Sequence, residues 1–576
     1  MAKEKNPATE PTVASNEFDT HTKQQQDLSA GIVSRRSFLA AGAGMAAVGC
    51  ESLGSAQTRI AGGEAAASKR RATAPKAPYD TLREYVAALE AHDLVLRFDR
   101  VNQDEYEATA IVYALIDKYG WYEAPAVLIE NVKQNGQWIK GPIIINHMGH
   151  WETECIMFGL EPVKGDSRAS YRKALDYTRD MLVDGQIPLI PPVEVSNDQA
   201  LCKQVIDTGD DIDLTQFAFI QSNPADGGRY VNTGSVFTTD PELGINYGTY
   251  RCQMRGPKIL GVNPEPNQTG WRMLMAAKER GEEYAPVSIA VGQDPAVWTT
   301  SGSKIAPRGF GKKINAVDEL AVAGGLRGKA IEMVKSETND IMVPAHCEMV
   351  IEGRVPLNEP GLPEGPFGEM YGYLGPQKPE NFWMEITAIT YRKDPWVMNQ
   401  FTGATRGYVT APISSIFNES FARMIPGLIE INQVVDTTGW GIARIKKTKP
   451  GQGLKVGKQI ASIIPLFKVM VVVDEDVDPL NWYEVGLAMG ARMTPASSTT
   501  VIKGRGMPLD PSTTDRGASS SKLVIDATRQ WPEEGGPEEY PELNRALLEE
   551  QAPESFDRVE DKWGDVIATW GKRDYV

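Results

Sequence analysis

The stretch EGPFGEMYGY, Glu364–Tyr373, places two glutamates five residues apart around a Gly-Pro-Phe-Gly turn. Glycine and proline are typical of turns, and glutamate is common on exposed loops. Taken alone, the stretch predicts a polar surface turn. The second interpretation is that the turn holds Glu364 and Glu369 at a fixed separation for proton transfer. The rest of the chain decides between the two.

The bulk composition is that of a globular protein rich in turns. The chain has 576 residues, of which 41% are hydrophobic and 24% charged, and this suits more than one domain. Fifty-four glycines and 38 prolines indicate a strand-rich α/β or α+β protein. Acidic residues outnumber basic ones by 76 to 60. Because a surface of net charge −16 repels a phosphate backbone, we expect no nucleic acid among the partners.

The few cysteines and histidines predict neither a disulfide framework nor a zinc site. The five cysteines form no C-x-x-C pair. His147 and His150 are three residues apart in NHMGHW, but no third nitrogen or sulfur ligand lies near them in the sequence. We therefore expect a loop with two solvated histidines.

The N-terminal segment is typical of an export signal. Arg35-Arg36, then Phe38-Leu39, then an apolar stretch to Gly49 match a twin-arginine signal. The apolar run is too short for a stable membrane anchor. The sequence before Cys50 also resembles a lipoprotein cleavage site, with Cys50 as the lipid acceptor. We expect residues 1–56 to be this signal, the Tat translocase to export the chain, and the product to be periplasmic or a membrane-anchored lipoprotein.

The remaining chain divides into a linker, two folded parts and an acidic arm. Residues 57–79 have little periodicity and predict a linker. A helix with apolar spacing begins at about Leu82, with Asp80 as its expected N-cap. From about residue 205 alternating apolar runs predict mostly strands. FKVMVVVDEDVD followed by NWYEVGLAMGARM predicts a βα unit. The expected domains are 80–400 and 401–530, with an acidic C-terminal arm at 531–576.

Several motifs occur in a fixed order along the chain. They are INYGTYR with Asn246 and Arg251, VGQDP at 291–295, ETNDIMVPAHCEMVIEG at 337–353, EGPFGEMYGY at 364–373 and VVVDEDVDP at 471–479. INYGTYR is strand-like, and an odd separation would point Asn246 and Arg251 to opposite faces of one extended segment. With this ordered series the chain resembles the UbiD family of reversible decarboxylases, from about residue 80 to about 530. The resemblance implies prenylated flavin mononucleotide (prenylated FMN) as cofactor, supplied by a partner flavin prenyltransferase.

The resemblance assigns a catalytic Glu-Arg-Glu trio to Arg251, Glu364 and Glu369. An arginine can bind a carboxylate with two parallel hydrogen bonds and stays charged. By resemblance, Glu364 is the arginine partner, kept ionised by it. Glu369 is the proton donor to carbon after CO2 leaves, and burial would raise its pKa for that role. An ion-pair network that only braces a turn is the alternative.

The resemblance also implies a site for the cofactor and its metal. The family holds the flavin phosphate through Mn2+, with Mg2+ chemically similar, and with a monovalent cation such as K+ near by. Its ligands are an asparagine, a histidine and a glutamate. Asn246 and Glu319 match the first and the last, and oxygen donors suit such cations. The histidine is missing near Thr269, so a hydroxyl or water would have to replace it. Further cofactor contacts are expected at Thr249, Tyr250, Arg251, Thr300 and Ser301, and Lys468 either lies near the phosphate or caps a buried strand.

The predicted fold is an α/β (α+β) UbiD-like fold, with a split β-barrel flavin-binding domain and a C-terminal α/β oligomerisation domain. The predicted function is a reversible non-oxidative decarboxylase, or carboxylase, of an aromatic or α,β-unsaturated acid. Family members are dimers or hexamers, so we expect a homo-oligomer. One alternative is a flavin oxidoreductase that uses ordinary FMN on the same barrel. Another is a non-catalytic exported binding or assembly protein, which the missing histidine favours and the trio opposes.

Overall fold

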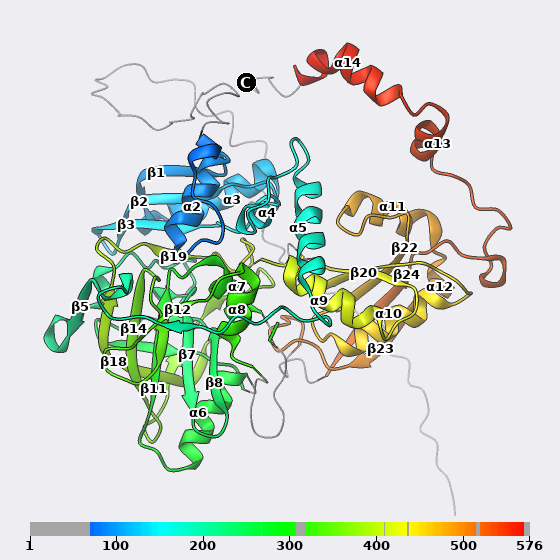
Figure 1. Cartoon of the computed structure of the whole chain (residues 1–576). Helices are drawn as coiled ribbons and strands as arrows, with labels where there is room; N and C mark the ends of the chain where they lie inside the picture. The colour runs from blue at the N-terminus through cyan, green and yellow to red at the C-terminus, as the bar shows by residue number, and fades with distance from the viewer. Residues whose placement is uncertain are drawn as a thin grey trace, which may run out of the picture. The chain divides into compact units, whose positions relative to one another are not determined.

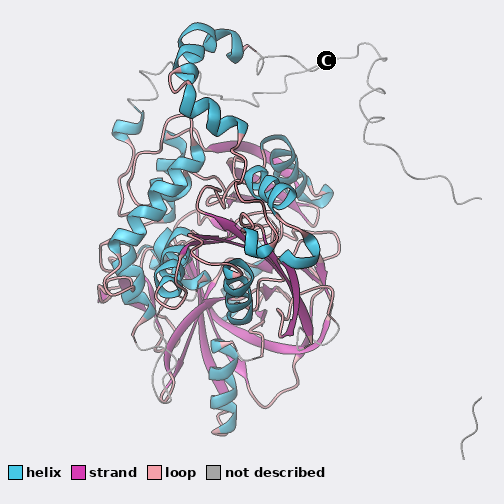
Figure 2. Ribbon diagram, turned by 90° about the vertical axis from the view of Figure 1, so that its right-hand side faces the viewer, coloured by secondary structure: helices cyan, strands magenta, loops and turns pink. Residues whose placement is uncertain are grey.

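The computed structural model of the chain describes residues 70–569, except 267, 304, 307–316, 408, 435–436 and 514–518. The predicted export signal at 1–56, with Cys50, lies outside the described residues, as does most of the linker. Both helices and strands occur along the described chain (Figures 1 and 2). The mixed α/β class predicted from the sequence is confirmed. Within these ranges, no helix is long and apolar enough to cross a membrane.

A four-stranded sheet with the order β1-β2-β3-β19 forms the first layer. Its elements and the helices around it are α2 (Leu82–Ala91), β1 (Val95–Asn102), α3 (Glu107–Tyr119), β2 (Ala126–Gln134), β3 (Gln137–Ile145), α4 (Thr153–Met157), α5 (Ser167–Met181) and β19 (Val397–Asn399). The apolar face of α2 is buried, as its spacing predicts. The predicted N-cap is wrong: Thr81, not Asp80, caps α2, because the Thr81 side chain accepts the Glu84 N–H.

An eight-stranded sheet carries the middle of the chain, where the split barrel is predicted. Its main path is β10-β18-β14-β11-β7-β8, with β15 and β5 also paired to β18, and β14, β11, β7 and β8 run side by side in Figure 1. The strands are β5 (Val205–Thr208), β7 (Ser235–Asp240), β8 (Gly244–Thr249), β10 (Ile259–Val262), β11 (Tyr284–Val291), β14 (Met349–Pro356), β15 (Leu362–Glu364) and β18 (Lys378–Tyr391). The pairs along the main path are antiparallel.

Shorter elements complete this part of the fold. They are β4 (Val193–Glu194), β6 (Tyr230–Val231), β9 (Cys252–Gln253), β12 (Glu332–Lys335), β13 (Met342–Pro344), β16 (Phe367–Gly368), β17 (Leu374–Gly375), α6 (Thr269–Glu279), α7 (Pro295–Gly302) and α8 (Glu319–Arg327). The stretch INYGTYR is not one strand. β8 ends at Thr249 and pairs with β7, whereas β9 starts at Cys252 and pairs with β6. The face alternation predicted for Asn246 and Arg251 therefore does not apply.

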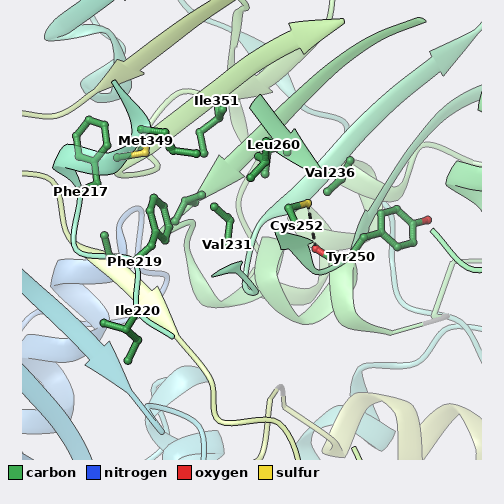
Figure 3. Close-up of a cluster of buried hydrophobic side chains, with 14 of the residues drawn as sticks. Phe217, Phe219, Ile220, Val231, Val236, Tyr250, Cys252, Leu260, Met349 and Ile351 are labelled. Carbon is green, nitrogen blue, oxygen red and sulfur yellow. Dashed lines mark hydrogen bonds between the residues drawn. The ribbon is translucent and has the colours of Figure 1, made fainter. Parts of the chain in front are cut away.

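A hydrophobic core surrounds the residues between β8 and β9. Figure 3 shows Tyr250 and Cys252 among Val231, Val236 and Leu260. Both side chains that flank Arg251 are thus buried in the core, at 7% and 0% exposure. Because its two neighbours are anchored by apolar packing, Arg251 is held in place at the edge of the core.

A five-stranded sheet with the order β20-β21-β22-β24-β23 forms the C-terminal part. Its elements are α9 (Ala411–Ala422), β20 (Leu428–Gln433), β21 (Trp440–Ile445), α10 (Gln452–Ile463), β22 (Val469–Asp474), α11 (Trp482–Arg492), α12 (Pro495–Ser498), β23 (Thr499–Gly504) and β24 (Ser520–Asp526). The buried strand β22 is parallel to β21 and β24 and runs into α11, which confirms the predicted βα unit. Two helices follow, α13 (Asn544–Gln551) and α14 (Ser555–Ala568). The predicted domain boundaries remain predictions.

The two histidines of NHMGHW are not solvated, contrary to the prediction. His147 and His150 are only 1% and 8% exposed. Burial lowers the pKa of His147 to about 3, so its ring is neutral at ordinary pH, and its Nδ1 lies 3.2 Å from the Gln400 amide nitrogen. The loop is buried by tertiary packing that its polar composition does not reveal.

Candidate active site

Arg251, Glu364 and Glu369 meet in one buried cluster, although Arg251 lies more than a hundred residues before the glutamates in the chain. Arg251 donates from Nε to Glu364 Oε1 and from Nη2 to Glu364 Oε2, each at 2.8 Å. Its Nη1 donates to Glu369 Oε1. The side chains are 9%, 2% and 12% exposed for Arg251, Glu364 and Glu369. One guanidinium therefore links the two carboxylates away from bulk water.

Different local structures place the two glutamates. Glu364 is the last residue of β15, opposite Lys378 of β18. Glu369 follows β16, and its backbone N–H donates to Tyr373 O at 2.8 Å. The turn between them reverses the chain so that both carboxylates reach Arg251, which also lies over the Phe367 ring at 5.0 Å. EGPFGEMYGY is thus a turn, but the expectation of a polar surface turn is wrong for Glu364 and Glu369, whose carboxylates are buried against Arg251.

The electrostatics of the cluster differ from residue to residue. Burial raises the pKa of Glu369 more than the charge and hydrogen bond of Arg251 lower it. The pKa of Glu369 is therefore raised. Burial lowers the pKa of Arg251, but its hydrogen bonds and the charges of Glu364 and Glu369 outweigh this and raise it. The arginine is therefore firmly charged, whereas Glu369 accepts a proton more readily than an exposed glutamate.

Sequence reasoning missed three residues that surround the trio. The Tyr230 hydroxyl donates to Glu364 Oε1 at 3.3 Å. The Gln253 Oε1 accepts the Gly365 N–H at 3.1 Å, and the Asp226 carboxylate accepts the Gly368 N–H at 3.0 Å. Tyr230 and Gln253 lie in two-residue strands and Asp226 lies in a bend before β6, and such short elements carry no spacing signal. Only the pairing of β6 with β9 brings these segments to the turn.

The predicted cofactor residues lie along β8 and the two helices beside it. The Thr249 hydroxyl is 2.9 Å from the Ser301 hydroxyl of α7, and the Glu319 Oε2 accepts the Tyr247 N–H at 3.1 Å. Asn246 is 3% exposed, and its amide nitrogen lacks a hydrogen bond of good geometry, with the Tyr250 hydroxyl beside it. The structure thus brings Asn246, Thr249, Ser301 and Glu319 together around one strand.

Two other predicted contacts use their hydroxyls internally. The Tyr250 ring lies in the core, and its hydroxyl accepts the Gly270 N–H at 3.0 Å. The Thr300 hydroxyl donates to Ala296 O, one turn back in α7, at 2.9 Å. Lys468 precedes β22, and its Nζ lies 3.0 Å from each carboxylate oxygen of Asp510. The Tyr250 hydroxyl thus already accepts one hydrogen bond within the protein, and the Thr300 hydroxyl already donates one.

The predicted metal site is incomplete in its protein donors. Asn246 and Glu319 are oxygen donors of the kind that Mn2+ or Mg2+ accepts. The third ligand is expected near Thr269, the first residue of α6, where the sequence has no histidine. In the part of the chain that the structure describes, no group of three or more His, Cys, Asp or Glu side chains has metal-binding geometry. The residues present do not complete the metal site that the resemblance implies.

Comparison with known proteins identifies the family. Residues 193–405 match the model of the 3-octaprenyl-4-hydroxybenzoate carboxy-lyase Rift-related domain (UbiD), and residues 407–527 match that of the carboxy-lyase C-terminal domain (UbiD_C). The chain belongs to the UbiD family. The predicted enzyme class, a UbiD-type carboxy-lyase, is confirmed.

Individual relatives in the UbiD family cover most of the chain. A phenolic acid decarboxylase of Sedimentibacter hydroxybenzoicus is 30% identical over 80% of this chain and 94% of its own. The open form of vanillic acid decarboxylase from the same organism superposes with a TM-score of 0.69, at 26% identity, over 85% of this chain and 99% of its own. HmfF of Pelotomaculum thermopropionicum, a UbiD-class enzyme in complex with FMN, has a TM-score of 0.66 at 25% identity, over 81% and 97%.

Proposed function

We propose that this protein is a non-oxidative decarboxylase, or carboxylase in the reverse direction, of an aromatic or α,β-unsaturated carboxylic acid, with prenylated FMN as cofactor. The observation that carries the proposal is the buried arginine shared by Glu364 and Glu369. Family membership supports the reaction class. The phenolic and vanillic acid decarboxylases among the relatives support an aromatic acid as substrate.

Arg251 and Glu364 act as a substrate-positioning pair in this proposal. The two parallel hydrogen bonds from Arg251 to Glu364 fix the plane of the guanidinium. The remaining N–H donors of Arg251 are then oriented to bind the substrate carboxylate. A correctly oriented carboxylate lowers the entropic cost of reaching the transition state.

Glu369 moves the proton. After CO2 leaves, the neutral Glu369 carboxyl delivers its proton to the carbon that carried the carboxylate, and the same group takes a proton from that carbon in the reverse direction. Its raised pKa increases the neutral fraction near neutral pH. Arg251 contacts the same carboxyl, so the charge that forms on Glu369 after proton transfer is stabilised where it appears.

The proposed cofactor is supported by the family and by the polar residues around β8. When bound, the modified flavin supplies the electron sink that side chains lack. The buried amide of Asn246 and the linked hydroxyls of Thr249 and Ser301 are the residues that we propose hold its polar end. A flavin prenyltransferase would supply the group. No step is assigned to a metal, because the donor set is incomplete.

The proposal is tested by co-expressing the full chain with a flavin prenyltransferase. The purified protein should carry a bound flavin chromophore and release CO2 from at least one member of a panel of aromatic and cinnamic-type acids. A well-folded preparation without flavin would overturn the enzymatic proposal. Ordinary FMN with reductase activity and no CO2 release would favour the oxidoreductase alternative.

We also propose export through the twin-arginine route and assembly into a homo-oligomer. The Arg35-Arg36 pair before an apolar run supports export, and family resemblance supports a dimer or hexamer. Residues 1–56 fused to a reporter should direct it out of the cytoplasm, and replacing Arg35 and Arg36 by lysine should abolish this. Replacing Cys50 by alanine tests lipidation by loss of membrane association. Light scattering of the purified chain tests the oligomer.

A further inference from the structure

The turn between Glu364 and Glu369 is hydrogen-bonded to the segment 223–227. The Gly227 N–H donates to Pro366 O at 2.8 Å, and the Gly368 N–H donates to Asp226 Oδ1 at 3.0 Å. A side chain at Gly227 would lie only 2.4 Å from Gly365 O, so the two backbones are in direct contact. The segment 223–227 therefore supports the turn by direct contact.

Asp226 is the acidic residue of the segment 223–227. Its other oxygen, Oδ2, accepts the Asn223 N–H at 2.9 Å, so each carboxylate oxygen binds one backbone amide. The residue is 7% exposed. A buried carboxylate that accepts backbone N–H groups forms stronger hydrogen bonds than a neutral acceptor, and the bond to Gly368 joins residues 142 positions apart in the chain.

Gly368 is held by backbone contacts alone, the hydrogen bond to Asp226 and the pairing of β16 with β17. It has no side chain to anchor it, and a Cβ built there meets no heavy atom closer than 4.0 Å. Glycine is also the residue with the greatest conformational freedom. Since Gly368 directly precedes Glu369, rotation of this peptide would move the Glu369 carboxyl away from Arg251.

We infer that Asp226 is a positioning residue for Glu369, acting by holding the Gly368 backbone amide beneath the turn. The inference deepens the proposed function and rests on it for the catalytic consequence. It assigns Asp226 no contact with substrate or cofactor. The alternative is that Asp226 only stabilises its own loop through Asn223, without an effect on Glu369.

Three variants of the full chain separate these roles. Asp226→Ala removes both acceptors, and Asp226→Asn keeps the size but places an NH2 group against one backbone N–H. Asp526→Asn is the matched control. Asp526 is 2% exposed, and its carboxylate likewise accepts two backbone amides, from Leu454 at 3.2 Å and from Thr528 at 3.0 Å, in the C-terminal sheet.

The first measurement is hydrogen–deuterium exchange of the purified protein without cofactor, so it does not depend on the proposed reaction. Peptides that cover 364–373 should exchange about ten- to a hundredfold faster in Asp226→Ala, with a smaller increase in Asp226→Asn, as expected for loss of a buried hydrogen bond to a charged group. Asp526→Asn should leave these peptides unchanged. Unchanged exchange at 364–373 in both Asp226 variants would overturn the inference.

The second measurement is steady-state kinetics of the flavin-loaded enzyme. Asp226→Ala should lower kcat at least tenfold with KM within about threefold of the wild type. The reason is that the displaced Glu369 carboxyl acts after substrate binding. Asp526→Asn should retain the wild-type kcat at a temperature where it is folded. A wild-type kcat in an Asp226 variant with a loosened turn would overturn the inference. An inactive wild type would instead contradict the proposed function, and the exchange result would still decide whether Asp226 holds the turn.

Discussion

Arg251 binds Glu364 through two parallel hydrogen bonds, Nε to Oε1 and Nη2 to Oε2, both 2.8 Å long. The pair is almost fully buried, and the third corner of the guanidinium contacts Glu369. A single planar group thus sets both the position and the charge environment of the two glutamates.

Replacing Arg251 by lysine should lower kcat/KM by about a hundredfold or more, because a point charge cannot hold Glu364 in plane and contact Glu369 together. The measurement is CO2 release by the flavin-loaded protein. Arg354→Lys is the matched control. Arg354 binds Glu385 through Nε and Nη2 on a half-exposed surface, where a change within about 0.5 kcal/mol in stability and no change in turnover are expected. Equal activity of both variants would refute the positioning role of Arg251.

The two glutamates should respond differently to replacement by glutamine. Glu369→Gln removes the proton and should lower kcat by about 10²–10⁴-fold while flavin stays bound and the melting temperature changes little. Glu364→Gln breaks the buried bidentate pair with Arg251. It should lower activity and also reduce the free energy of unfolding by about 3 kcal/mol. Activity, flavin absorbance and thermal melts are the measurements. Full activity of Glu369→Gln would show that another group donates the proton.

The stability contribution of Asp226 should depend on pH. Burial raises its pKa from 3.8 to about 6, although the backbone N–H groups and Arg251 lower it, while Glu369 raises it further. Because the folded state holds the proton more tightly than the unfolded state, this contribution is fully present below pH 3.8 and is lost as the pH rises to about 6. The unfolding free energy of the wild type minus that of Asp226→Asn should therefore decrease as the pH rises from 3.8 to about 6. Parallel pH curves for the two proteins would contradict it.

Gly375 leaves the space that the Glu369 side chain occupies. A Cβ at Gly375 would lie 2.8 Å from both Cγ and Oε1 of Glu369, so Gly375→Ala should displace the carboxyl and lower kcat by about ten- to a hundredfold. Gly504→Ala, also at the end of a strand, meets no atom within 4 Å and should leave kcat unchanged. A fully active Gly375→Ala protein would show that the Glu369 carboxyl is not held where the structure places it.

Local patterns were sufficient for much of the secondary structure. The apolar run before Asp474 and the helix after it predicted β22 and α11, because a buried parallel strand and an amphipathic helix have distinct periodicities. The end of β8 within INYGTYR, at Thr249, was missed, since the residues on both sides have strand-like composition and only the different partner strands separate β8 from β9. The burial of His147 and His150 was missed because the polar composition of their loop does not reveal the tertiary packing around it.

The sequence by itself determined the family, predicted the trio and showed that no histidine lies near Thr269, because these depend on which residues occur in which order. Only the tertiary structure decided that one guanidinium joins Glu364 to Glu369 and that Asp226 lies under their turn. The register of β6 with β9 pairs Tyr230 with Gln253 and so carries residues 226–230 to the turn. Hydrogen bonds between segments more than a hundred residues apart leave no local pattern, and they form only when burial brings their partners together.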